Sequence, residues 1–345
     1  MTDGPASRRA VLKKTVDFAL MGAARRIVEA ISVVPGETVI IVYDQARETI
    51  ASAIVDAVQM LPAKVETFML ENLGARPLQA VPDPLREGMG RAQASVMLIG
   101  VDDERELPLR REFVTLVESL KLRHAHVIGV TRGALIAGFN VEPARIVDMT
   151  RQVRLRITGR ASFRYRTGYG TDLEVTLDPD ARWGEHVGII RPGRWENLPA
   201  GQLFTWPKDV RGVFVANASL DISFKGQSPS VQTAAVRFEI EEGRCRAVTS
   251  DDAELAQSVD RYLRATPDLD RVGQVALGTN PGLMSPIGEP VFDQCVPGLH
   301  LVFGWTNPKV TGAPWVANAI LSANGAGGDL EVDGKALMRA GRYLL

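Results

Sequence analysis

The first half of the sequence alternates strand-like and helix-like segments, and this alternation constrains the fold more than any other feature. Apolar side chains recur at helical spacing over 8–32, and the apolar run Thr38–Tyr43 after Pro35-Gly36 is typical of a buried strand. Further strands are predicted at 64–70, 95–100 and 125–130, with helices between Asp44 and Pro62 and around 108–121. Strands that alternate with helices predict a parallel sheet covered on both faces.

From about residue 155 the pattern changes to short strands separated by glycine and proline. Strands are predicted at 173–177, 213–216, 220–224, 235–240, 246–248, 272–277, 299–304 and 315–321. One helix interrupts them, because Asp251 and Glu254 form a capping box before Leu255 and Val259. We therefore expect an α/β protein, with an N-terminal parallel-sheet α/β domain over 1–154 and an α+β domain rich in antiparallel strands over 155–345.

Composition excludes several classes of protein. The chain has 345 residues, 45% of them hydrophobic and 23% charged, which is ordinary for a globular protein. Its 40 Lys and Arg against 41 Asp and Glu give a net charge of −1, so there is no electrostatic case for nucleic-acid binding. Two cysteines, Cys245 and Cys295, disfavour a disulfide framework or a thiolate metal site, and four scattered histidines disfavour a histidine-rich one.

No run approaches the roughly 18 apolar residues of a membrane span, and the N-terminal segment lacks the apolar stretch of a signal peptide. We therefore expect a cytoplasmic protein with no membrane association. The motifs of phosphate loops, zinc proteases and serine hydrolases are absent. Gly168-Tyr169-Gly170 predicts a tight turn, and Gly325–Gly328 a loop tip.

Asp221, Ser223 and Lys225 alternate with apolar residues, so they share one face of a predicted strand. A serine beside a desolvated lysine is one arrangement of nucleophile and base. A solvated strand face with an ion pair is the alternative interpretation.

The most distinctive segment is 191–207, which reads RPGRWENLPAGQLFTWP. Two tryptophans, three prolines and two glycines in this segment predict an ordered loop, and loops on a rigid scaffold often carry sites. Together with 170–173, 275–281, 298–304 and 332–334, the segment resembles the bacterial metalloaminopeptidases of the T and S type. It is still more similar to their relatives, the 2,5-dihydroxypyridine dioxygenases. The resemblance covers residues 165–345 by motif and the first half by layout; it implies an aminopeptidase T/S-like fold and a homodimer.

The departures from the family pattern lie at the metal ligands that the resemblance implies. Gln202 and Gln274 stand where the aminopeptidases have ligand glutamates, and Ala317 and Ala319 stand where they have a histidine and an aspartate. Only His300 matches a ligand outright. Neutral amides and alanine bind divalent metals poorly or not at all, so we expect no metal and no other cofactor.

The expected pocket keeps polar groups without a metal. His300 titrates near neutral pH and is the candidate acid or base; a core histidine between Leu299 and Leu301 is the alternative. The candidate substrate-binding residues are Gln202, Gln274, Asn280, Trp305 and Trp315. Arg164 and Arg166 are either carboxylate-binding residues or surface charges.

Three functions remain open. The first is a metal-independent, hydrolase-type enzyme that acts through His300 on a small amide, peptide or heterocycle. The second is a metal-dependent aminopeptidase or ring-cleaving dioxygenase with a rearranged site that uses Asp221, Glu289 or Asp293. The third is a non-catalytic protein that binds a small molecule or a partner.

Overall fold

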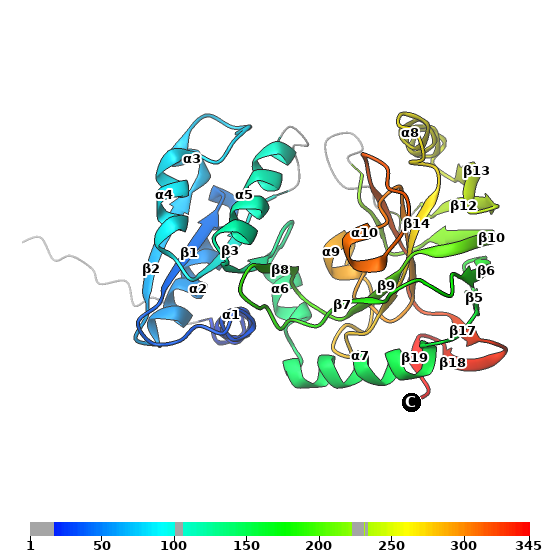
Figure 1. Cartoon of the computed structure of the whole chain (residues 1–345), viewed down its shortest axis with the longest axis horizontal. Helices are drawn as coiled ribbons and strands as arrows, with labels where there is room; N and C mark the ends of the chain where they lie inside the picture. The colour runs from blue at the N-terminus through cyan, green and yellow to red at the C-terminus, as the bar shows by residue number, and fades with distance from the viewer. Residues whose placement is uncertain (1–16, 101–105, 223–230, 232–233) are drawn as a thin grey trace, which may run out of the picture.

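Figure 1 shows two halves side by side, with the long helix α7 (Pro143–Ile157) leading from the first to the second. The structure is a computed structural model, and it describes residues 17–100, 106–222, 231 and 234–345. In this described part the strands form one parallel sheet in the first half and two antiparallel sheets in the second. The predicted fold class is therefore confirmed.

The parallel sheet is built from four strands of the first half and one later segment. In spatial order these are β2 (Lys64–Met69), β1 (Thr38–Tyr43), β3 (Ala94–Leu98), β4 (Arg123–His126) and β8 (Arg194–Asn197). The expected strands at 38–43, 64–70 and 95–100 are confirmed, whereas the fourth ends at His126 instead of Val130.

Helices cover both faces of this sheet, as the alternation predicts. Ile41 and Val96 pack with α1 (Phe18–Ala30), α2 (Glu48–Gln59) and α6 (Arg132–Gly138) on one face. On the other face Ile40 and Met97 pack with α4 (Asp83–Arg91) and α5 (Leu107–Ser119). The first nine residues of the predicted helix 8–32 lie outside the described residues.

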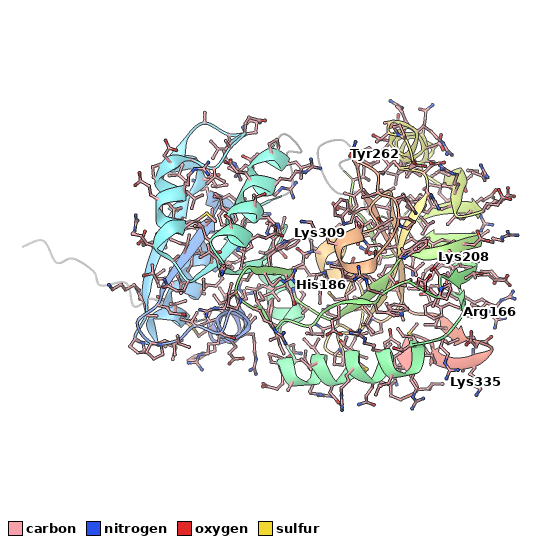
Figure 2. The ribbon with its side chains drawn as sticks, in the orientation of Figure 1. Arg166, His186, Lys208, Tyr262, Lys309 and Lys335 are labelled. Atoms are coloured by element: carbon pink, nitrogen blue, oxygen red, sulfur yellow. The ribbon has the colours of Figure 1, made fainter. Side chains whose placement is uncertain are left out.

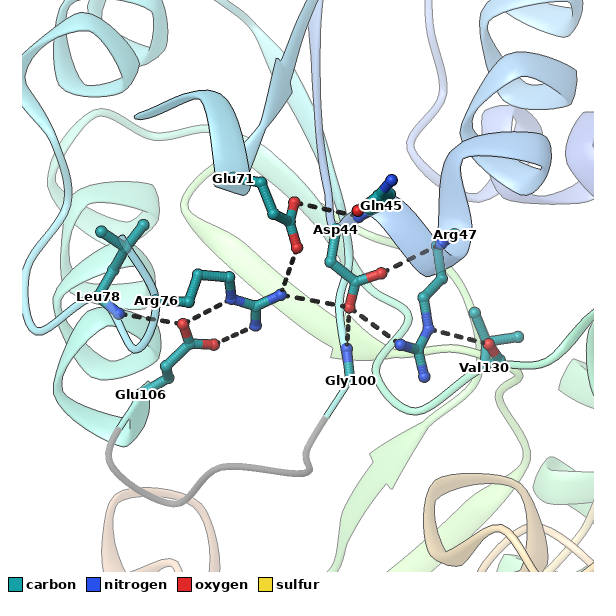
Figure 3. A network of polar contacts seen from close by, with 9 residues as sticks. All are labelled: Asp44, Gln45, Arg47, Glu71, Arg76, Leu78, Gly100, Glu106 and Val130. Atoms are coloured by element: carbon teal, nitrogen blue, oxygen red, sulfur yellow. Dashed lines mark hydrogen bonds and ion pairs between the residues drawn. The ribbon is translucent and has the colours of Figure 1, made fainter. Parts of the chain in front are cut away.

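The carboxyl edge of the parallel sheet carries a network of charged side chains (Figure 3). Asp44 directly follows β1, and its carboxylate accepts from the backbone N–H of Gly100, after β3, at 2.7 Å. It also pairs with Arg47 at 3.0 Å and lies 3.7 Å from Arg76. Strand order reverses between β1 and β3, which is where open α/β sheets commonly bind ligands. Here protein side chains occupy that position (Figure 3).

Segment 191–207 supplies strands to two different sheets. Its β8 extends the parallel sheet beside β4, and β9 (Gln202–Thr205) joins a sheet of the second half. The chain therefore returns to the parallel sheet after residue 154, beyond the predicted end of the N-terminal domain.

The second half consists of two packed antiparallel sheets. The larger runs β13 (Arg244–Ser250), β12 (Val236–Glu241), β10 (Pro207–Ala216), β6 (Asp172–Leu177), β5 (Ser162–Arg166), β17 (Asp329–Val332), β18 (Lys335–Arg339) and β19 (Arg342–Tyr343). The smaller, which we call the site sheet, runs β11 (Ser219–Leu220), β16 (Leu321–Asn324), β15 (Leu299–Phe303), β14 (Val272–Gly278), β9 and β7 (Gly184–His186). Phe238 of the larger sheet and Phe303 of the site sheet meet in the core, with ring centroids 5.2 Å apart.

Two local predictions were wrong. The helix α8 (Ala253–Arg264) is capped by Asp252, whose carboxylate accepts from Leu255 N–H at 3.0 Å, and not by Asp251. Residues 315–320 are not a strand, since the N–H of Ala317 bonds the Gly304 carbonyl beyond the end of β15 and pairing begins only at Leu321. Of the alternating triad, Asp221 is exposed, whereas Ser223 and Lys225 lie outside the described residues.

Within the described ranges no helix combines the length and the apolar character needed to cross a bilayer.

Candidate functional site

One face of the site sheet is apolar and the other carries polar side chains. Leu203, Val275 and Leu301 belong to the core between the two sheets. Successive side chains of a strand point to opposite faces, so Gln202, Gln274 and His300 share the other face. We call this the polar face. Three predicted site residues from three neighbouring strands thus meet on one surface.

His300 lies in the middle of the polar face and is 1% exposed. Its Nε2 is 3.1 Å from the carbonyl oxygen of Val296. A carbonyl oxygen can only accept, so Nε2 carries the proton and Nδ1 is an acceptor. Nδ1 is buried and has no hydrogen-bond partner within the described structure. Burial lowers the pKa of His300 from 6.5 to about 4, so the ring is neutral at physiological pH. The expected titration of His300 near neutral pH is therefore wrong.

Gln274 is held at one end of the polar face by a backbone irregularity. The pairing of β14 with β15 shifts between Val272 and Gln274, so Gly273 is a bulge. A Cβ on Gly273 would lie 2.6 Å from the carbonyl oxygen of Trp305. The bare glycine lets this carbonyl approach and accept from the Gln274 side-chain amide at 3.0 Å. The bulge therefore fixes the amide nitrogen and places Gln274 beside Trp305.

The two predicted tryptophans gather at this same end. The Trp305 side chain is 41% exposed, so the polar face reaches solvent here. The carbonyl of Trp315 accepts from the Thr306 hydroxyl, and its indole Nε1 is buried without a partner among the described groups. Ala317 lies beside this end through its bond to Gly304.

Gln202 lies two strands away from His300, toward the first half of the molecule. It is 7% exposed and pairs with Gly278 of β14 and with His186 of β7. The His186 ring stacks on Phe204 at 5.1 Å, and its Nδ1 is buried without a partner in the described part of the chain. Figure 2 places His186 at the centre of the molecule, between the two halves.

Asn280 holds backbone rather than facing the polar face. Its side-chain amide donates to the Ala200 carbonyl at 2.8 Å, and its oxygen accepts from Gly282 N–H at 2.9 Å. These bonds join the end of segment 191–207 to the loop after β14. The predicted ligand contact of Asn280 finds no support in this geometry.

The carboxylates proposed for a rearranged metal site lie elsewhere or are already engaged. Asp293, in the short helix α9 (Pro290–Asp293), is fully buried, and its carboxylate accepts from the N–H groups of Ile287 and Gly288 at 2.8 and 3.0 Å. Burial raises its pKa. Glu289 precedes this helix, and Asp221 is exposed at the end of β11.

The donor groups of the polar face do not fit a divalent metal. No three His, Cys, Asp or Glu side chains of the described residues gather closely enough to hold an ion. The three predicted ligand positions on this face, Gln202, Gln274 and His300, offer one imidazole nitrogen and two carboxamides, and none of them is a carboxylate that could balance a dication. His300 alone keeps the arrangement of a metal ligand, since its second ring nitrogen donates to a backbone carbonyl.

A surface concavity lies away from the polar face. It measures about 570 Å³ and is lined by Arg166, Thr167, Gly168, Gly328, Asp329 and Ala340. Figure 2 places Arg166 at the outer side of the second half, far from His186. Arg166 pairs with Glu331, and Arg164 pairs with Asp172 and Glu174, so both arginines are surface charges. Residues 168–170 form the predicted turn, closed by a bond from Gly170 N–H to the Thr167 carbonyl.

Comparison with known proteins supports the fold. Neither a family model nor a curated protein sequence matches the chain. The solved structure of aminopeptidase T (AmpT) from Thermus thermophilus matches with a TM-score of 0.69 and 17% identity, over 95% of this chain and 99% of that one. The 2,5-dihydroxypyridine dioxygenase from Pseudomonas putida KT2440 matches with a TM-score of 0.66 and 17% identity, over 94% and 96%. The aminopeptidase-like fold expected from the resemblance is therefore confirmed, over both halves.

Sequence reasoning missed two residues of this region, His186 and Arg271. His186 lies in a three-residue strand that no pattern predicts. Arg271 directly precedes the predicted strand 272–277, and the glycine at 273 is the signal of a bulge that brings it to the polar face.

Proposed function

We propose that this protein is a metal-independent enzyme that binds a small amide, peptide or heterocycle on the polar face, with His300 Nδ1 as acceptor and base. The observation that carries the proposal is His300 Nδ1, which is buried without a partner among the described residues, in a ring whose tautomer is fixed by Val296. Buried polar atoms are rarely left without a partner, so an orphaned acceptor indicates a position for a ligand donor.

The neighbouring groups suit an amide-like ligand. An amide N–H can donate to Nδ1, and the oxygen of the Gln274 side chain can accept, because the bond of that side chain to the Trp305 carbonyl uses its nitrogen. The ligand reaches this row from the exposed Trp305 end. A neutral imidazole accepts a proton but cannot deliver one, so His300 acts here as base and not as acid.

Non-catalytic binding of the same ligand is the second candidate. The observation that favours it is the low basicity of His300, since burial lowers its pKa to about 4. A base of this strength accepts a hydrogen bond well and removes a proton poorly at neutral pH.

The test combines binding and turnover on the full chain. The probes are 2-pyridone, alaninamide and alanyl-alaninamide, titrated by calorimetry and incubated for product analysis with and without chelator. For any probe that the wild type binds, His300→Asn is expected to weaken binding about tenfold, which is the cost of losing one buried hydrogen bond. His124→Asn is the control, because His124 is buried in the parallel sheet and bonded to Ser95.

Turnover that persists with chelator supports the enzyme, and binding without turnover supports the second candidate. Equal binding by the wild type and His300→Asn contradicts both. Nitrogen NMR of the histidine rings checks the tautomer independently of any ligand, and a proton on His300 Nδ1 also contradicts the proposal.

A further inference from the structure

An arginine that forms no ion pair with a carboxylate of the described residues lies at the exposed end of the polar face. The guanidinium carbon of Arg271 lies 4.1 Å from the centroid of the Trp315 ring. Arg271 is half-buried and directly precedes β14. Within the described ranges, no Asp or Glu side chain forms an ion pair with it.

The two nearest carboxylates are held by other arginines. Asp268 pairs with Arg244, and Asp270 pairs with Arg244 at 2.7 Å and with Arg264 at 3.3 Å. Burial and the positive charge of Arg244 lower the pKa of Arg271, although an arginine stays charged near neutral pH. Arg271 is therefore a partly desolvated cation that Asp268 and Asp270 attract, without an ion pair to a carboxylate of the described residues.

The Gly273 bulge directs this cation to the polar face. Val272 faces the core between the sheets, so Arg271 before it points the other way. After the bulge Gln274 also points away from the core, and the two side chains share one surface although they are three residues apart. The cation–π contact with Trp315 holds the guanidinium in place, and its N–H groups are the donors that a planar anion would use.

From this geometry we infer that Arg271 and Trp315 form a subsite for the carboxylate of a small organic acid. Guanidinium and carboxylate match in a bidentate pair. Gln274 and His300 are diagonal neighbours on β14 and β15, a separation of about 7–8 Å. A carboxylate on Arg271 therefore places the remainder of the molecule over Gln274 and toward His300. The inference rests on the proposed function and deepens it by naming the substrate class as a carboxylic acid.

The experiment compares two ligands of equal shape and different charge. Benzoate and benzamide are titrated into the full chain by calorimetry at low salt. Benzoate is expected to bind about tenfold more tightly, the usual difference for a hydrogen-bonded charge pair. Arg271→Gln removes this preference. Arg271→Lys keeps the charge but lacks the planar guanidinium, so it retains only part of the preference for benzoate.

Arg164→Gln serves as the matched control, because Arg164 is an ion-paired arginine on the distant sheet, and its loss leaves the benzoate preference unchanged. Trp315→Phe keeps an aromatic platform and most of the preference, which separates a binding role from mere loss of folding. Benzoate that binds no more tightly than benzamide, undetectable binding included, overturns the inference. A preference that survives Arg271→Gln overturns it too.

The two proposals fail separately. If His300→Asn weakens binding of the neutral amides while benzoate shows no preference, the carboxylate subsite is wrong and the proposed function stands. If the benzoate preference depends on Arg271 while no amide responds to His300→Asn, the subsite stands and the proposed function is wrong.

Discussion

The free energy of unfolding is expected to fall steeply as the pH drops from about 6.5 to 4, by several kcal/mol, because the histidines are neutral in the fold. Burial lowers the pKa of His300 and His186 to about 4 and that of His124 to about 3. His126 is lowered as well, by burial and by the charge of Arg110. These are all four histidines of the chain.

The direction follows from the two end states. Between pH 6.5 and 4 the unfolded chain binds protons on these histidines and the folded chain does not, so acid favours unfolding. One pKa unit corresponds to about 1.4 kcal/mol, which gives about 3 kcal/mol for the fully buried His300 alone. Glu196 and Asp293 act in the opposite direction, since burial raises the pKa of Glu196 to about 7 and raises that of Asp293 as well, but they are two groups against four.

Urea unfolding at pH 7.5, 6.5, 5.5 and 4.5 measures this dependence. His300→Asn is expected to have a shallower dependence than the wild type, because one titrating group is gone. His186→Asn should also have a shallower pH dependence, because His186 Nδ1 is likewise buried without a partner among the described residues. An unfolding free energy that stays constant over this range would show that the folded chain takes up protons as readily as the unfolded one, contrary to the burial of the histidines.

Asp44→Asn is expected to lower the free energy of unfolding by about 3 kcal/mol, the typical cost of removing one partner from a buried charge cluster. The Asp44 side chain is 5% exposed and bonds Arg47 and the Gly100 N–H. Without its charge, Arg47 loses this ion pair, and among the described residues Arg76 keeps Glu71 and Glu106 (Figure 3).

The matched control is Asp148→Asn, which removes a carboxylate from the exposed Asp148–Arg151 pair. Exposed pairs contribute less than about 1 kcal/mol, so this variant should unfold close to the wild-type midpoint. Equal losses in the two variants would mean that the Asp44 network does not stabilise the carboxyl edge of the parallel sheet.

Local patterns predicted the parallel sheet well, because β1 and β3 are mostly apolar runs and β2 alternates polar and apolar residues. Thr38–Tyr43 is the same in the prediction and in the structure. Asp44 caps the short 3-10 turn after it, by accepting from Arg47 N–H at 3.1 Å. The helix α7 was missed although Ile146, Val153 and Ile157 recur at helical spacing and are buried.

Pairing between strands that are far apart in the sequence could not be predicted from local patterns. The β8 segment has the sequence RWEN, which shows neither alternation nor an apolar run. It becomes a strand because β4 offers a free edge, and parallel pairing with β4 is decided by the fold as a whole. The same holds for β7, which carries His186 beside Gln202.

The family motifs predicted one part of the candidate site. They imply that three residues lie together, and these do share one face of the site sheet: Gln202, Gln274 and His300. Two other positions depend on strand register and could not be predicted from motif spacing. The Asn280 side chain bonds the backbone, and the Gly273 bulge lets Arg271 share the polar face with Gln274. Whether these residues bind a ligand stays a prediction.

The central claim is that the polar face binds its ligand without a metal. Two substitutions at predicted ligand positions provide the positive control. Gln202→Glu with Gln274→Glu puts carboxylates at the two positions where the resemblance implies metal ligands. Carboxylates bind divalent ions where amides do not, so this double variant is expected to retain more metal than the wild type.

The most direct measurement is elemental analysis of the wild-type chain, purified without chelator or histidine tag, before and after incubation with iron(II), zinc, manganese and cobalt and desalting. One imidazole and two amides should retain less than about a tenth of an equivalent of any of these metals per chain. Metal retained at close to one equivalent would contradict the account, and the aminopeptidase and dioxygenase reactions would then be the ones to assay.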